Sequence, residues 1–148
     1  MSVVTTIYAQ AVGGVFGGTV NLLGDNIYIA LLDSSYTADF DTDQFWSDVS
    51  SNEITGTGYT AGGYELVNKT FTYDAGTGLW TFTNTVDPSW STATFTCRNA
   101  VMYDNSGTPS TSPLLTCAAF SADQTCTAET FTLHVASTGL LQTSQATG

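Results

Sequence analysis

Positively charged residues are almost missing from this chain, in which Lys69 and Arg98 stand against 13 Asp and Glu and the formal net charge is −11. Affinity for nucleic-acid backbones comes from clustered Lys and Arg, and the anionic cytoplasmic face of a membrane repels an acidic surface. We therefore expect no nucleic acid and no membrane among the partners of this protein. A partner with a basic surface fits this charge better, because it would relieve the repulsion among the carboxylates.

Long hydrophobic runs are also absent, since no stretch approaches the roughly 20 apolar residues that span a bilayer. The first 18 residues lack the cationic region of a secretory signal. These two absences predict a soluble protein that is made in the cytoplasm. A length of 148 residues is typical of one domain. We expect residues 1–148 to form a single β-rich domain with an N-terminal helical contact segment (1–24) and a C-terminal tail (141–148).

Cysteine is scarce, and the three cysteines, Cys97, Cys117 and Cys126, have no spacing that matches a metal-binding motif. An odd number of cysteines cannot all pair within one chain, and free Cys is commonly buried as a small hydrophobe. We expect buried free thiols, with a Cys117–Cys126 bridge across a hairpin as the alternative.

Thr, Ser and Gly are abundant, and aromatic residues make up 12% of the chain. This composition favours strands over helices. Near the N-terminus, apolar residues at close to helical spacing predict a short helix that ends near Gly13 and Gly14. Alternating or compact apolar runs predict the strands. These strands cover residues 26–34, 64–74, 78–86, 94–104, 113–120 and 127–136. The pattern predicts a mainly β fold, an antiparallel β-sandwich or open barrel with a short N-terminal helix.

The second and third of these strands flank the turn AGTG and are expected to form a hairpin. Its candidate buried face consists of Leu66, Phe71, Tyr73, Trp80 and Phe82. We expect Trp90 to close one end of the core. The polar tail after Leu141 is expected to fray.

Residues 34–63 read as a long polar loop, within which 45–54 predicts one or two helical turns. Loops of this length in compact domains are usually functional or docked on another surface. Asp39, Asp41 and Asp43 have the spacing that opens a calcium-binding loop, but Gln44 stands where such a loop requires Gly. We therefore predict no metal and no cofactor, and interpret these carboxylates as a solvated or partner-facing patch.

No catalytic constellation follows from the sequence. His134 is the only histidine, and it lies in an alternating strand with no nucleophile motif beside it. The glycine-rich segment 56–63 lacks the Lys and the strand-to-helix context of a phosphate-binding loop, so it predicts turns and a bulge. The sequence thus predicts a protein that is not an enzyme and serves as a structural or binding surface.

Two segments carry a resemblance to a known family: FWSDVSSNEITGTGYTAGG (45–63) and AVMYDNSGTPSTSPLL (100–115). With the order of predicted elements from about Tyr8 to Leu140, they make the chain resemble a family of small virion structural proteins from tailed bacteriophages. The resemblance implies a capsid or tail component. It favours a capsid decoration (cement) protein that binds the major capsid protein on the outer surface of the head, as a homotrimer. The alternative is a tail- or fibre-associated protein that binds a host-surface glycan.

For such a protein we expect two contact regions. The first is the N-terminal segment, with Val4, Ile7, Tyr8 and Val12, and the second is the acidic loop, with Asp39, Asp41, Asp43, Phe45 and Trp46. Exposed aromatic residues would be anchors of an interface. Phe45 and Trp46 either serve in this way or pack into the protein's own core, and the sequence leaves both readings open.

Overall fold

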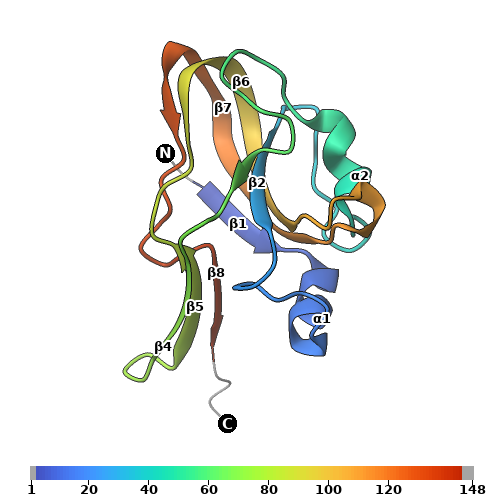
Figure 1. Ribbon diagram of the computed structural model, residues 1–148, viewed down its shortest axis with the longest axis vertical. Coiled ribbons are helices and arrows are strands. Elements are labelled where there is room, and N and C mark those ends of the chain that lie inside the picture. Colours follow the sequence, from blue (N-terminus) through green and yellow to red (C-terminus); the bar gives the residue numbers. More distant parts are fainter. Residues whose placement is uncertain (1–2, 145–148) are drawn as a thin grey trace.

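The fold consists of two antiparallel β-sheets that do not close into a barrel, as the computed structural model shows over the described residues, 3–144 (Figure 1). The larger sheet has the strand order β1-β7-β6-β2-β3, and the smaller has the order β4-β5-β8. The strands are β1 (Val3–Ile7), β2 (Ile27–Leu32), β3 (Tyr64–Glu65), β4 (Lys69–Asp74), β5 (Leu79–Asn84), β6 (Ser89–Asp104), β7 (Leu114–Thr132) and β8 (Leu141–Ser144). The prediction of a mainly β, open antiparallel fold with a short N-terminal helix is confirmed.

Two helices and two 3₁₀ turns complete the fold over residues 3–144. They are α1 (Ala9–Gly17), α2 (Trp46–Val49), η1 (Ser50–Asn52) and η2 (Pro109–Thr111). The helical turn predicted within 45–54 is confirmed by α2 and η1. Among residues 3–144, no helix has both the length and the apolar character needed to cross a membrane.

The N-terminal segment differs from its prediction, because residues 3–7 form a strand and not the start of a helix. All five residues of β1 are β-branched, and such side chains favour strands. Val4 and Ile7, expected on the helix, lie in β1 opposite Ala119 and Thr116. The helix also continues past Gly13 and Gly14 to Gly17, where Gly18 ends it in the left-handed conformation with φ of 77°.

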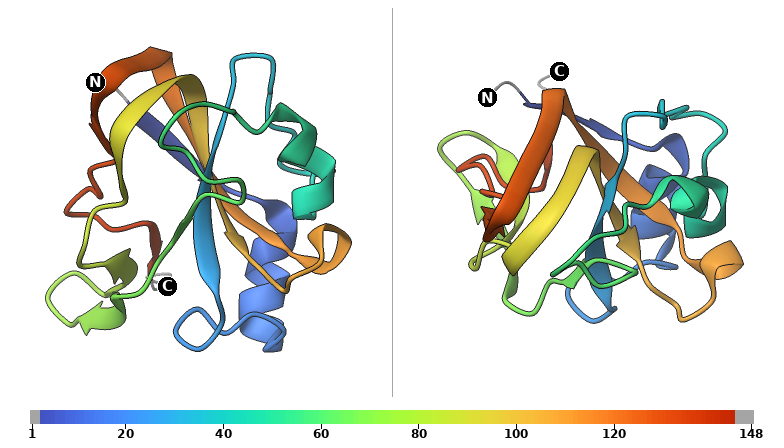
Figure 2. Two further views of the ribbon diagram at one scale, coloured as in Figure 1. Left: turned by 45° about the horizontal axis from the view of Figure 1, so that its top comes forward. Right: turned by 90° about the horizontal axis from the view of Figure 1, so that it is seen from above.

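The larger sheet is built around one long ribbon made of β6 and β7 (Figure 2). Residues 113–120 and 127–136 were predicted as separate strands, whereas 114–132 is one strand of 19 residues. Its pairing with β6 shifts register at four places, and Thr92 and Ala128 adopt positive φ there. Bulges of this kind bend a ribbon without ending it. Residues 121–126, between the two predicted strands, therefore lie within a continuous, bent strand.

Figure 2 shows that the loop containing α2 lies on one side of the larger sheet and the smaller sheet lies on the other. On the loop side, Trp46 stacks on Tyr103 of β6, with 4.5 Å between ring centroids and 7° between planes. At the end of the long ribbon opposite the β6–β7 turn, Trp90 is buried and contacts the rings of Tyr64 and Phe131. Trp90 is thus part of the core, as predicted.

The predicted hairpin is formed by β4 and β5, and Leu66 and Phe82 are buried as expected. Tyr73 and Trp80 are 43% and 40% exposed, so the prediction that they are buried is wrong. They share a face with Phe82, but the outer half of the hairpin projects away from the larger sheet (Figure 1). Residues 141–144, expected to fray, pair with β5 as β8, and the rest of the predicted tail lies outside the described residues.

All three cysteines are free and buried, so the expected free thiols are confirmed and the Cys117–Cys126 bridge is not formed. Burial raises the pKa of Cys97 to about 12 and that of Cys117 to about 11. Both thiols are therefore protonated and unreactive at neutral pH.

Candidate functional site

The carboxylates of the acidic loop mainly hold the loop's own backbone. Asp39 Oδ1 accepts hydrogen bonds from the N–H groups of Asp41 and Thr42, each at 3.1 Å. Asp48 Oδ2 accepts from the N–H groups of Gln44 and Phe45 at 2.9 Å, at the start of α2. Hydrogen bonds that stabilise the charged carboxylates lower the pKa of both groups. At Asp39 the main donors are the side chain and the backbone N–H of Thr42. At Asp48 the main donor is the backbone N–H of Phe45.

Asp43 connects the loop to the N-terminal segment. The buried Tyr8 hydroxyl lies 2.6 Å from that of Tyr36, which donates to Asp43 Oδ2 at 2.8 Å. The same carboxylate oxygen accepts from the N–H of Asp39 at 3.1 Å. Desolvation is the main cause that raises the pKa of both tyrosines. This chain of hydrogen bonds, called here the tyrosine network (Tyr8, Tyr36, Asp43), fixes the loop against the residue that precedes α1.

The two regions predicted separately as contact regions therefore lie next to each other. The N–H of Ala9 donates to the carbonyl of Phe40 at 2.9 Å, and the rings of Tyr8 and Phe40 are 5.1 Å apart. A shallow pocket of about 460 Å³ is lined by Gln10 and Gly13 of α1 and by Phe45 of the loop. We define the α1–loop surface as three residues that line this pocket, Gln10, Gly13 and Phe45, together with the exposed Asp41, which follows Phe40 in the chain.

The predicted contact residues differ in their access to solvent. Tyr8 and Trp46 are buried in the protein's own core, so the reading of Trp46 as a core residue holds. Asp39, Asp41 and Val12 are exposed, and Ile7, Asp43 and Phe45 are half-buried. For Val4 the structure describes the strand pairing but not the side chain. The exposed or half-buried residues among them remain candidates for a contact.

His134 lies just beyond the end of β7, not within a strand, and its side chain is exposed. Its Nδ1 is 2.8 Å from Asp87 Oδ2, while Asp87 Oδ1 accepts from the N–H of Val135 at 2.9 Å. The bond from Val135, followed by the one with His134, lowers the pKa of Asp87. Within residues 3–144, Asp87 is the only side chain hydrogen-bonded to His134, and no group of three or more His, Cys, Asp or Glu could hold a metal ion.

The glycine-rich segment 56–63 forms turns, as predicted, and the structure explains its glycines. Gly63 has φ of +88°, and a Cβ atom there would lie 2.1 Å from the carbonyl oxygen of Ile29. Glu53 holds the segment in place, because its Oε1 accepts from the Tyr59 hydroxyl at 2.8 Å and from the Gly62 N–H at 2.6 Å. Burial raises the pKa of Glu53. The segment is therefore a structural element that packs tightly on β2.

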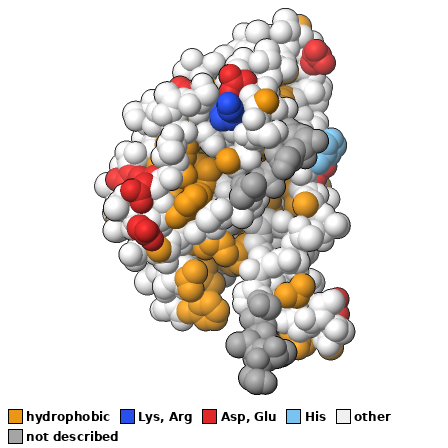
Figure 3. Space-filling view, turned by 180° about the vertical axis from the view of Figure 1, so that it is seen from behind, with side chains coloured by type: hydrophobic (Ala, Val, Ile, Leu, Met, Phe, Trp, Pro, Cys, Tyr) orange, Lys and Arg blue, Asp and Glu red, His pale blue; other side chains and the backbone are white. Residues whose placement is uncertain are grey.

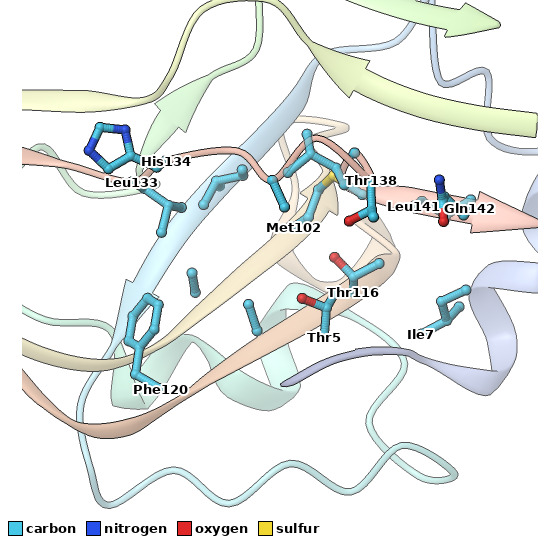
Figure 4. Close-up of a pocket in the computed structure, with 16 residues that line it drawn as sticks. Thr5, Ile7, Met102, Thr116, Phe120, Leu133, His134, Thr138, Leu141 and Gln142 are labelled. Carbon is cyan, nitrogen blue, oxygen red and sulfur yellow. The ribbon is translucent and has the colours of Figure 1, made fainter. Parts of the chain in front are cut away.

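A larger cavity of about 710 Å³ lies between the larger sheet and residues 133–142 (Figure 4). Its floor is a row of side chains across four neighbouring strands: Ile29, Met102, Thr116 and Ile7. Leu133, Thr138 and Leu141 line the other wall. We call this cavity the β1 groove. Its described lining contains no Asp, Glu, Lys or Arg, and His134 is its one titratable side chain.

The outer face of α1 exposes apolar side chains. Phe16 is 79% exposed and Val12 is 49% exposed, and their spacing of four residues places them on one face of the helix. No residue of α1 is charged. Figure 3 shows hydrophobic side chains gathered on the side of the molecule where α1 lies, and next to it across the middle of the same view. The sequence predicted apolar residues at helical spacing in this segment. It did not predict that Ala11 is buried while Phe16 is exposed, because that difference depends on the residue at which the helix begins.

Comparison of the chain with protein-family models, with curated proteins and with solved structures found no match in any of the three.

Proposed function

We propose that this chain is a structural protein of a tailed-bacteriophage virion, a decoration protein that binds the major capsid protein on the outer surface of the head. The observation that carries this proposal is the α1–loop surface, where the two segments predicted as contact regions meet. It combines an exposed carboxylate, Asp41, with a half-buried aromatic side chain, Phe45. Aromatic anchors surrounded by a polar rim are typical of a protein interface.

The two segments that carry the family resemblance also support a structural role. The N–H of Trp46 donates to the carbonyl of Ser112 at 2.8 Å, and the Tyr103 hydroxyl donates to the carbonyl of Gly62 at 2.8 Å. Segments 45–63 and 100–115 thus contact each other and share the Trp46–Tyr103 stack. The residues of these two segments pack against each other and form turns. This structural role fits a family of structural proteins.

The proposed mechanism is mass action. A protein that binds the assembled shell but not its separated subunits stabilises the shell, by about 2.7 kcal/mol per site when its free concentration is about 100 times Kd. Many copies on one head multiply this gain. The net charge of −11 favours a basic site on the capsid, because such a site would relieve the repulsion among the carboxylates.

Binding to purified heads that lack the protein tests this proposal. We expect Asp41→Lys to lower occupancy at least several-fold, because it reverses a charge on the α1–loop surface without removing a structural hydrogen bond of the Asp41 carboxylate. Glu129→Lys, on the exposed part of β7, makes the same charge change elsewhere and should bind normally. Equal occupancy of both variants would overturn the assignment of the surface, and no binding of the wild-type protein to heads would overturn the proposed location.

A second candidate function rests on the exposed end of the β4–β5 hairpin. Trp80 stacks on Phe71 with 5.0 Å between ring centroids, and Tyr73 lies 5.1 Å from Trp80. Half-exposed aromatic rings of this kind can stack on sugars, which favours a tail- or fibre-associated protein that binds a host-surface glycan. In that case Trp80→Ala would abolish binding to host envelope polysaccharide while Val86→Ala would not, and unchanged binding of Trp80→Ala would exclude this site.

A further inference from the structure

We propose that the pocket beside Phe45 receives an arginine side chain of the partner protein, whose guanidinium pairs with the carboxylate of Asp104 at the pocket floor. This inference rests on the proposed function, because it names the chemical group that the α1–loop surface recognises on its partner. Gln10, Gly13 and Phe45 of that surface line the pocket together with Asp104. The pocket and the surface are therefore one site.

The floor of the pocket is an aspartate. Asp104 is the last residue of β6 and is 8% exposed. It is the only buried residue and the only charged residue in the described lining. Its backbone N–H donates to the carbonyl of Pro113, another lining residue, at 3.0 Å. The deepest residue of the pocket is thus fixed in place by the end of the β6–β7 ribbon.

The charge of Asp104 is not balanced by a contact within residues 3–144. Its carboxyl group neighbours that of Asp25, and the charge of Lys69 only partly offsets this pairing of like charges. The Lys69 ammonium donates to the backbone carbonyl of Asp25, and no ion pair among the described residues reaches either carboxyl group. Two neighbouring carboxyls without a cation in contact form a site that a cationic ligand completes.

The ionisation of Asp104 supports the same conclusion. Desolvation, followed by the charge of Asp25, raises its pKa to about 6, so the carboxylate is ionised at pH 7.5. Water screens a buried charge less than an exposed one, so a cation that reaches this carboxylate interacts with it strongly.

The walls of the pocket favour a guanidinium over an ammonium. Phe45 contributes a half-buried aromatic ring, and guanidinium groups stack on aromatic faces. Gln10 and Gln44 add neutral amide oxygens, which can accept from the N–H groups that the carboxylate does not use. The five donors of arginine match such a set of acceptors, whereas lysine is a compact, strongly hydrated charge. The pocket volume of about 460 Å³ exceeds that of one arginine side chain.

Binding of this kind depends on pH. A proton and a guanidinium compete for the Asp104 carboxylate, so affinity rises as the pH increases through about 6. Asp25, before β2, and Lys69, in β4, are the charged groups that act on Asp104, and α1 carries none. Asp104 is the only titratable side chain in the described lining. The expected affinity at pH 5 is about tenfold lower than at pH 7.5.

Titration of the purified protein with N-acetylarginine amide, followed by NMR of its backbone amides, tests the pocket without any virion component. We expect saturable shifts at Gln10, Gln44 and Ser106, which all line the pocket, with the tenfold dependence on pH given above. N-acetylcitrulline amide has nearly the same shape without the charge and should cause no shift. Equal responses to the two compounds, or no response to the arginine compound, would overturn the proposal.

Two variants assign the binding to the pocket floor. Asp104→Asn keeps the size of the side chain and removes its charge, so it should bind the arginine compound at least about tenfold more weakly at pH 7.5. Glu129→Gln removes a carboxylate from the exposed part of β7 and should bind like the wild-type protein. Unchanged affinity of Asp104→Asn, or an equal loss in both variants, would overturn the role of Asp104.

The same variants separate this pocket from the decoration role. Asp104→Asn should also occupy purified heads several-fold less than Glu129→Gln does at the same protein concentration. Heads that bind both variants equally would overturn the arginine pocket and leave the decoration role intact. A wild-type protein that binds the arginine compound but not heads would overturn the decoration role and support the pocket.

Discussion

At the scale of single residues, close backbone contacts explain why glycine is required at particular positions of the loop. The segment 56–63 contains four glycines, and at Gly63 the requirement is steric as well as conformational. The carbonyl of Ile29 occupies the place where a side chain would begin. Glycine at this position therefore permits the loop to lie against β2.

The first prediction follows from that contact. Gly63→Ala should lower the free energy of unfolding by at least about 2 kcal/mol more than Gly107→Ala, measured by urea denaturation. The two glycines have nearly the same φ, +88° and +87°, but a Cβ at Gly107 would meet nothing within 4 Å. Equal losses for the two variants would show that conformation alone matters, and not the contact with Ile29.

A second residue-scale prediction concerns Asp104, which is buried near Asp25 and Lys69. Desolvation, and then the charge and hydrogen bonding of Asp25, raise its pKa to about 6. The folded state therefore holds a proton that the unfolded state releases near pH 4, so this group's contribution to stability is lost as the pH rises through about 6.

Asp104→Asn removes this titration. At pH 7.5 the variant should be more stable than the wild-type protein by about 1–3 kcal/mol, and below pH 4 the difference should vanish. Urea denaturation of both proteins over this pH range measures the difference. Parallel stability curves would contradict the pKa assigned to Asp104.

At the scale of elements, the tyrosine network joins α1 to the acidic loop. Tyr36→Phe leaves the buried hydroxyl of Tyr8 without its partner and removes one donor from Asp43. We expect a loss of about 1–3 kcal/mol in the free energy of unfolding. Tyr28→Phe removes a hydroxyl that makes a weak 3.4 Å bond to Glu65 and should cost less than about 0.5 kcal/mol. Similar losses for both variants would show that the network does not hold the loop.

The sequence predicted several elements because their local patterns and their tertiary contacts agree. The buried strand at 26–34, the hairpin and the turn of helix at 45–54 are examples. It failed at β1, where β-branched residues that also fitted a helical stripe pair with β7. It also failed at Tyr73 and Trp80, because alternation indicates which side chains share a face but not how far the opposing sheet extends.

The candidate site shows the same limit. The acidic loop and the N-terminal segment were recognisable from composition, but their adjacency depends on hydrogen bonds between residues 28 positions or more apart in the chain. The β1 groove is built from four strands and the segment after β7, so no local pattern indicates it. Long-range topology, and not residue type, determines both surfaces.

At the scale of the whole molecule, the surfaces divide by charge. Carboxylates dominate a chain with only two Lys and Arg, whereas α1 and the β1 groove are without charge in the described residues. This division suits a protein that meets a basic partner through an acidic surface.

The central claim is that this protein decorates the head of a virion, and electron microscopy of purified particles tests it most directly. Reconstruction of particles with and without the protein should show added density on the outer capsid surface, into which the two-sheet fold fits with its α1–loop surface toward the major capsid protein. Density found only on the tail, or no difference between the two reconstructions, would contradict it.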